Sequence, residues 1–397
     1  MGAVVVMPIF GTRPEAIKLA PVIKALEADG SFDVRPVVTG QHREILDQVL
    51  EVFGLEPVAD LDIMVARQSL SHVTSATLTG LDPVFDRHRP QVVLVQGDTT
   101  TTFAASLAAF YRRIPVGHVE AGLRSDDPYH PFPEEINRRL TSVVASWHYA
   151  PTPRAGRRLA AEGVEAGRIW VTGNTVIDAL LEIARRDLPI AQPGVREHLQ
   201  AGRRLLLVTA HRRESWGEPH RSVFRALKRL VGMFEDVAVV VSVHPNPAVR
   251  SVAWEELGGA ERVVLLEPPA YVQWVPLLKA AYLVLTDSGG IQEEAPALGK
   301  PVLVLREVTE RPEGVEAGCA RLVGTEADRI VGVASELLSD RAAYEAMAHV
   351  ANPYGDGRAS KRIVQALKKA LALDDGEVEP FGATPGAGEG GRGDCKQ

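Results

Sequence analysis

The chain has 397 residues, of which 45% are hydrophobic and 24% charged, and its formal net charge is -7. This is the composition of a globular protein, and the length suggests two or three domains. The negative charge balance offers no basic surface for a nucleic acid. Any bound phosphate must therefore meet a local basic site.

The two cysteines, Cys319 and Cys395, have no paired spacing. This argues against a disulfide framework or a thiolate metal site and fits a reducing cytoplasm. The N-terminal run MGAVVVMPIF has no Lys or Arg before its apolar residues, so we interpret it as a first strand rather than a signal peptide. No apolar stretch approaches the roughly 20 residues that span a bilayer. We expect a cytoplasmic protein that binds neither membrane nor nucleic acid.

Short β-branched runs alternate with helical patterns along the chain. The first series predicts strands at 4–9, 34–38, 92–95 and 116–119, with helices from Pro14, around 45–52 and at about 101–111. The second series predicts strands at 205–208, 237–243, 263–266, 282–285 and 302–305. Strands this continuously apolar are covered on both faces, which predicts parallel sheets between layers of helices.

Two such series predict two doubly wound, Rossmann-like α/β domains that face a central cleft. Residues 1–172 form the predicted N-terminal domain and 173–357 the C-terminal domain, with the break in pattern lying between about 172 and 200. Residues 374–397 are rich in Gly, Asp, Glu and Pro and should be disordered. Because ligands of such sheets bind beyond the carboxyl ends of the strands, polar clusters at strand ends are the candidate sites.

The first cluster, Gly11-Thr12-Arg13-Pro14-Glu15, follows the first strand directly. Gly11 permits a tight turn, and Pro14 suits the start of a helix. Free backbone N–H groups at that helix start, together with Arg13 and Lys18, would make an anion site. The alternative is an ordinary strand-to-helix turn with solvated charges.

The second cluster begins with Ser288-Gly289-Gly290, after the strand that ends in Thr286. Two glycines at a helix start let backbone N–H groups approach a diphosphate, and Ser288 adds a hydroxyl donor. Glu293 or Glu294, a turn later, could accept from ribose hydroxyls. The alternative is a capped helix with acids in its first turn.

The third cluster consists of acids at strand and loop ends. Asp98 and Glu120 each end an apolar strand, and Glu134 and Glu135 follow a proline-rich loop. A helix cap would also account for Asp98, and a salt bridge to Arg124 for Glu120. Several acids crowded in one site can hold different protonation states and so serve as acid and base.

The fourth cluster is histidine-bearing. His211 follows the first strand of the second series, and His244 follows the next strand. A strand-end histidine can donate to a diphosphate or move a proton near neutral pH, although a packing or capping role is the alternative. Neither histidine lies in a metal-ligand pattern, and we predict no metal.

In this order, the clusters resemble those of the bacterial non-hydrolysing UDP-N-acetylglucosamine 2-epimerases, over nearly the whole chain to about residue 370. The matching segments are G-T-R-P-E-A-I-K (11–18), G-D-T-T-T-T (97–102), H-V-E-A-G-L-R (118–124), P-F-P-E-E-I-N-R (131–138), G-N-T-V-I-D (173–178), T-A-H-R-R-E (209–214), T-D-S-G-G-I-Q-E-E-A-P-A-L-G-K-P (286–301), T-E-R-P-E (309–313) and N-P-Y-G-D-G (352–357). Any one segment is a weak signal, whereas the collinear set is highly specific.

The resemblance implies a glycosyltransferase-B-like fold, with a final helix at about 358–372 crossing back to the first domain, and a homodimer. It implies no added cofactor, and UDP-N-acetylglucosamine and UDP as ligands. The implied catalytic residues are Asp98, Glu120, Glu134 and His211. The implied UDP-binding residues are Arg13, Lys18, Ser288, Gly289, Gly290, Glu294 and Arg311, to which we add His244. Candidates for a site where substrate activates the enzyme are Gln41, His42, Arg67 and Arg212.

The implied reaction is reversible inversion at carbon 2, giving UDP-N-acetylmannosamine for surface polysaccharide synthesis. The hydrogen on carbon 2 is not next to a carbonyl, so we expect UDP to leave carbon 1 first and a 2-acetamidoglucal to form. Three alternatives use the same features: a UDP-sugar glycosyltransferase, a hydrolysing epimerase and a non-catalytic nucleotide-sugar sensor.

Overall fold

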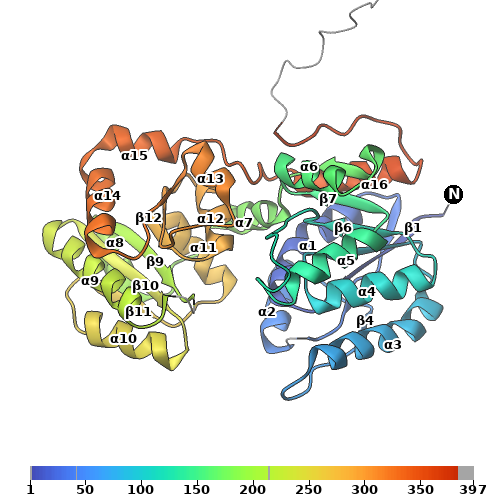
Figure 1. Ribbon diagram of the computed structural model, residues 1–397, viewed down its shortest axis with the longest axis horizontal. Coiled ribbons are helices and arrows are strands. Elements are labelled where there is room, and N and C mark those ends of the chain that lie inside the picture. Colours follow the sequence, from blue (N-terminus) through green and yellow to red (C-terminus); the bar gives the residue numbers. More distant parts are fainter. Residues whose placement is uncertain (1, 42, 213–214, 383–397) are drawn as a thin grey trace, which may run out of the picture. The chain divides into compact units, whose positions relative to one another are not determined.

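The computed structural model describes residues 2–41, 43–212 and 215–382 and divides the chain into two compact units. The N-terminal unit comprises Met1–Asp178 and Gly355–Gln397, and the C-terminal unit comprises Ala179–Tyr354. Each unit is built on a parallel sheet with helices packed against it (Figure 1). Among the described residues, none of the helices has both the length and the apolar character needed to cross a bilayer.

The sheet of the N-terminal unit has eight strands, in the order β4-β3-β1-β5-β6-β7-β8, with β2 also pairing with β1. The strands are β1 (Val4–Phe10), β2 (Phe32–Val34), β3 (Val37–Val38), β4 (Ala59–Asp60), β5 (Val92–Gln96), β6 (Val116–Val119), β7 (Trp147–Ala150) and β8 (Ile169–Val171). All pairings between these strands are parallel. Every residue of β5 is buried, as expected for a central strand covered on both faces.

The helices of this unit include one that comes from the far end of the chain. They are α1 (Arg13–Glu27), α2 (Arg43–Phe53), α3 (Leu70–His88), α4 (Thr100–Tyr111), α5 (Glu134–Val144), α6 (Pro153–Ala161), a short 3₁₀ turn (Ala166–Arg168), the start of α7 (Thr175–Arg185) and α16 (Ala359–Ala370). Helix α16 packs against α1. Its first turn is capped by the buried carboxylate of Asp178, which accepts from the N–H groups of Ala359 and Ser360.

The C-terminal unit has six parallel strands in the order β11-β10-β9-β12-β13-β14. The strands are β9 (Arg204–Ala210), β10 (Val237–Val243), β11 (Val263–Leu266), β12 (Ala281–Thr286), β13 (Val302–Val304) and β14 (Ala320–Leu322). The helices are α8 (Pro193–Gln200), α9 (Glu218–Met233), α10 (Pro247–Leu257), α11 (Tyr271–Ala280), α12 (Gly289–Ala297), α13 (Pro312–Ala317), α14 (Ala327–Ser339) and α15 (Arg341–Ala348).

Both sheets share one topological feature that locates the sites. The strand order reverses between β1 and β5 in the first sheet and between β9 and β12 in the second. In such sheets the loops at the carboxyl ends of these two strands diverge to opposite faces and leave room for a ligand. The predicted fold class, a pair of doubly wound parallel α/β domains, is therefore confirmed.

Two segments that the sequence analysis predicted differ in the structure. The strand expected at 34–38 is two short strands, β2 and β3, separated by Arg35 and Pro36; Pro36 has no N–H to donate to a ladder. The predicted disordered tail begins at 374, yet residues up to 382 are described, and Phe381 donates its N–H to the carbonyl of Val171 at 2.8 Å. Residues 383–397 lie outside the described part.

Candidate active site

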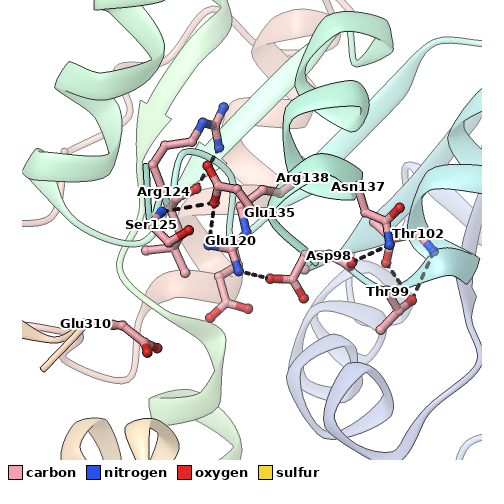
Figure 2. Close-up of polar contacts among 12 residues, drawn as sticks. Asp98, Thr99, Thr102, Glu120, Arg124, Ser125, Glu135, Asn137, Arg138 and Glu310 are labelled. Carbon is pink, nitrogen blue, oxygen red and sulfur yellow. Dashed lines mark hydrogen bonds and ion pairs between the residues drawn. The ribbon is translucent and has the colours of Figure 1, made fainter. Parts of the chain in front are cut away.

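Asp98 lies just beyond β5, at the reversal point of the first sheet. Its Oδ2 accepts from Nη2 of Arg138, and its carbonyl accepts from Nδ2 of Asn137 at 3.1 Å (Figure 2). The surrounding protein raises the pKa of the Asp98 carboxyl by desolvation, and the charge of Glu120 raises it further, while Arg138 opposes both; the net shift is upward. Thr99, not Asp98, is the N-cap residue of helix α4, so the Asp98 side chain is not used for capping.

Glu120 follows β6 with a φ of 65°, a left-handed backbone conformation that is uncommon outside glycine. Its side chain is almost fully buried and meets three donors. Nζ of Lys18 lies 2.7 Å from both carboxylate oxygens, Nδ2 of Asn174 donates to Oε1 at 3.0 Å, and Nε2 of Gln96 donates to Oε2. The strained backbone and this set of donors fix one orientation of the carboxylate.

The two glutamates at the start of α5 have different environments. Glu135 is fully buried and accepts from the N–H of Ser125 at 3.0 Å and from Nε of Arg139 at 2.7 Å. Glu134, in contrast, has a buried Oε2 with no hydrogen-bond partner among the described residues. A buried acceptor without a donor is costly unless a ligand supplies one. Glu134 is thus the better candidate for contact with a substrate.

The turn after β1 holds an unexpected set of hydrogen bonds. The N–H groups of Gly11 and Thr12 both donate to Oε2 of Glu15, at 3.0 and 2.7 Å. These two N–H groups are therefore already used and are not free to bind an anion. Arg13 is exposed at the first residue of α1 and stays a candidate for a phosphate contact.

In the C-terminal unit, His211 follows β9 and pairs with a carboxylate beyond β12. Nδ1 of His211 lies 3.0 Å from Oδ1 of Asp287, whose Oδ2 accepts the N–H groups of His211 and Arg212 at 2.7 and 2.8 Å. Burial would raise the pKa of Asp287, but the hydrogen bonds and charge of its partners outweigh it, and the pKa is lowered. The ring of His244 stacks on that of His211, with centroids 5.9 Å apart.

Helix α12 begins beside this pair with an open N-terminus. Ser288 is its N-cap residue but makes no side-chain cap hydrogen bond. A Cβ added at Gly290 would meet no atom within 4 Å, and one at Gly289 would approach only the guanidinium of Arg311, at 3.8 Å. The space around these two glycines lets a ligand reach the backbone N–H groups. Such N–H groups, at the positive end of a helix dipole, form an anion site.

Arg311 lies next to the start of α12 and is held there by residues of the C-terminal unit. It pairs with Glu293, and its carbonyl accepts from the hydroxyl of Tyr354 at 2.9 Å. Glu294 is buried. Nη1 of Arg212 lies 3.9 Å from Oε1 of Glu310. No group of three His, Cys, Asp or Glu side chains suited to a metal ion occurs in the described part of the chain.

The candidates for an activator site are only partly described. Oε1 of Gln41 accepts from Thr101 at 2.9 Å, and its carbonyl accepts from Gln68 at 3.0 Å. Arg67 is exposed, with a φ of 56°. His42 lies outside the described residues.

Residues 24–368 match the model of a protein family described as UDP-N-acetylglucosamine 2-epimerase. The UDP-N-acetylglucosamine 2-epimerase of Bacillus subtilis is 51% identical over 365 residues, which cover 91% of this chain and 94% of the relative.

The chain belongs to the UDP-N-acetylglucosamine 2-epimerase family.

Two solved structures of similar proteins contain ligands. The UDP-GlcNAc 2-epimerase of Neisseria meningitidis, bound to UDP-GlcNAc, has a TM-score of 0.82 and 46% identity, covering 92% of this chain and 100% of that one. The S. aureus protein MnaA, solved with UDP, has a TM-score of 0.84 and 47% identity, covering 95% of this chain and 100% of that one.

Several residues of this candidate site were not predicted from the sequence. Asp287, Arg138, Gln96 and Asn174 each bind a predicted catalytic side chain but were not singled out. Asp287 carried a detectable signal, since it is an acid directly after a buried strand. Gln96 and Asn174 carried none, because they meet Glu120 from positions 24 and 54 residues away.

Proposed function

We propose that this chain interconverts UDP-N-acetylglucosamine and UDP-N-acetylmannosamine by eliminating and re-adding UDP. One observation carries the proposal. In one sheet the carboxylates of Asp98, after β5, and Glu120, after the neighbouring β6, lie close enough to interact; in the other, the reversal point combines His211 with the open start of α12. Proton transfer and diphosphate binding are the two tasks that the reaction requires.

Departure of UDP comes first in this scheme. When the bond between carbon 1 and the diphosphate oxygen breaks, its electron pair leaves with UDP and positive charge develops on the ring. The start of α12, His211 and Arg13 would stabilise the negative charge on the departing diphosphate. Asp287 holds the imidazole of His211 in orientation and would stabilise its protonated form.

Loss of the carbon 2 proton follows, because the neighbouring positive charge acidifies that C–H bond. The C–H electron pair becomes the double bond of a 2-acetamidoglucal. Return of a proton to the opposite face, with re-addition of UDP at carbon 1, gives the epimer. We propose that Asp98, Glu120 and Glu134 share the proton transfers, and the raised pKa of Asp98 suits a group that must both take and give a proton.

An isotope experiment tests this function. The purified chain is incubated with UDP-N-acetylglucosamine in deuterated water without an acceptor, and carbon 2 is followed by NMR. We expect UDP-N-acetylmannosamine with deuterium at carbon 2. Free N-acetylmannosamine with UDP would instead identify a hydrolase, and unchanged substrate would contradict catalysis and favour a transferase or a sensor.

We also propose that the enzyme is a homodimer that joins through one face of α5. Ile136, Leu140 and Val143 are spaced along this face and are 39%, 41% and 80% exposed. Phe110 and Tyr111, at the end of the adjacent α4, are also exposed. Exposed apolar side chains grouped in this way favour an interface. Leu140→Arg should give monomers in light scattering, and Trp254→Arg, at an exposed apolar position of the other unit, should not.

From the family resemblance we further propose that the enzyme acts in the cytoplasm and supplies N-acetylmannosamine units for surface polysaccharides. We also retain a substrate-activation site at Gln41, His42, Arg67 and Arg212 as a proposal.

A further inference from the structure

Glu15 is a buried carboxylate in the third residue of α1, and it contacts two loops at once. Its side chain is 1% exposed. Oε2 accepts the N–H groups of Gly11 and Thr12, in the turn after β1. Oε1 accepts from the hydroxyl of Thr99, in the turn after β5, at 2.6 Å and from that of Thr102, in the first turn of α4, at 2.9 Å. The carboxylate therefore bridges the two loops of the reversal point.

A capping role explains only half of this arrangement. A glutamate at the third position of a helix commonly accepts one N–H at the helix start and leaves its other oxygen in water. Here the second oxygen is also buried and reaches the next loop. Burial raises the pKa of Glu15, and the hydrogen bonds that the carboxylate accepts only partly oppose this shift. Removing the carboxylate from water therefore costs free energy, which an ordinary helix cap would not require.

The bridged loops carry groups with different tasks. Arg13 follows directly after Thr12, and Asp98 directly precedes Thr99. The loops are also in close contact, because a Cβ added at Gly11 would lie 2.7 Å from Oγ1 of Thr101, in the first turn of α4. A change in the length of the bridge would shift one loop relative to the other.

We propose that Glu15 is a positioning residue that fixes the spacing between the Arg13 turn and the Asp98 turn. The inference rests on the proposed function, in which Arg13 stabilises the leaving diphosphate and Asp98 transfers the carbon 2 proton. Because Glu15 is buried, we assign it no direct contact with the sugar or the diphosphate. It acts through the two turns, because Arg13 and Asp98 must be held at the correct separation for departure of the diphosphate and transfer of the carbon 2 proton to occur on the same bound substrate.

Two substitutions separate the length of the bridge from its charge. Glu15→Asp keeps the charge but is one methylene too short to reach both loops. Glu15→Gln keeps the length: its Oε1 can accept the two N–H groups, and its Nε2 can donate to the threonine hydroxyls, which also act as acceptors. A positioning role therefore predicts that Gln is tolerated and Asp is not.

The experiment measures kcat, KM, UDP affinity and thermal melting for both variants. We expect Glu15→Asp to lower kcat about 10- to 100-fold and to change UDP affinity less than about threefold, with Glu15→Gln within about threefold of the parent in kcat. The partner side gives a second test that does not alter Glu15. Thr99→Val should lower kcat, and Thr99→Ser, which keeps the hydroxyl, should restore it.

A matched control is Thr77→Val, since Thr77 is buried and its hydroxyl has no hydrogen-bond partner among the described residues. Parent-like turnover in Glu15→Asp, or equal losses in Glu15→Asp and Glu15→Gln, would overturn the positioning role. If Glu15→Asp does not fold, the Thr99 pair decides, and equal kcat in Thr99→Val and Thr99→Ser would overturn it. Failure of the parent chain to epimerise would instead reject the proposed function.

Discussion

The ammonium of Lys18 lies 2.7 Å from both carboxylate oxygens of Glu120, with side-chain exposures of 18% and 5%. Sequence reasoning placed Lys18 with the UDP-binding residues and offered Arg124 as a partner for Glu120. In the structure Arg124 instead pairs with Glu162. The Lys18–Glu120 pair makes the orientation of a candidate catalytic acid depend on the helix that follows the first strand.

Lys18→Met should therefore destabilise the N-terminal unit. The buried Glu120 loses its cationic partner but keeps the donors Gln96 and Asn174, so we expect a loss of about 1–3 kcal/mol in the free energy of unfolding. The double variant Lys18→Met with Glu120→Gln should lose less than the sum of the single variants, because the uncompensated charge is gone. Additive losses in urea unfolding would show that the pair is not coupled.

Asp98→Asn should lower turnover and raise the stability of the fold at pH 7. We expect turnover to fall about 10²- to 10⁴-fold, with UDP affinity retained. Because the folded-state pKa of Asp98 is raised, its ionisation costs stability above the ordinary value of 3.8. The variant should thus unfold at higher urea than the parent at pH 7, and this advantage should vanish in acid. Near-parental turnover would remove Asp98 from the mechanism.

Asp287→Asn should impair His211 and make stability less dependent on pH. Turnover should fall about 10²- to 10⁴-fold, since the amide no longer stabilises a protonated imidazole. The pKa of Asp287 is lowered on folding, so its contribution to stability is present above 3.8 and is lost as the pH falls through the folded-state value. The variant should be the less stable protein at pH 7, with the difference closing in acid. An equal difference in the free energy of unfolding between parent and variant at pH 7 and in acid would contradict this.

Much of the site follows from sequence because it lies at strand ends. Asp98, Glu120 and His211 each follow a mainly apolar run closely, and that pattern locates them without any contact information. The short strands β7 and β8 were not predicted, because Trp-His-Tyr-Ala and Ile-Trp-Val are too brief to show a period. The bridging roles of Glu15 and Asp287 were also missed, since each depends on strand order, which brings distant loops together.

Arg67→Ala tests the proposed activator site. Arg67 is exposed and far in sequence from the candidate catalytic acids, so its loss should leave the fold unchanged. If substrate activates the enzyme there, the plot of initial rate against UDP-N-acetylglucosamine concentration should lose its sigmoidal shape in the variant. A curve with the parent's cooperativity would place the activator elsewhere.

The central claim is that the bond between carbon 1 and the diphosphate oxygen breaks during every inversion. It can be tested with UDP-N-acetylglucosamine carrying heavy oxygen in that bond. If UDP departs, its terminal phosphate can rotate before re-addition, and phosphorus NMR should show the label moving from the bridging to the non-bridging positions in both epimers. Inversion at carbon 2 with all of the label still in the bridge would contradict the account.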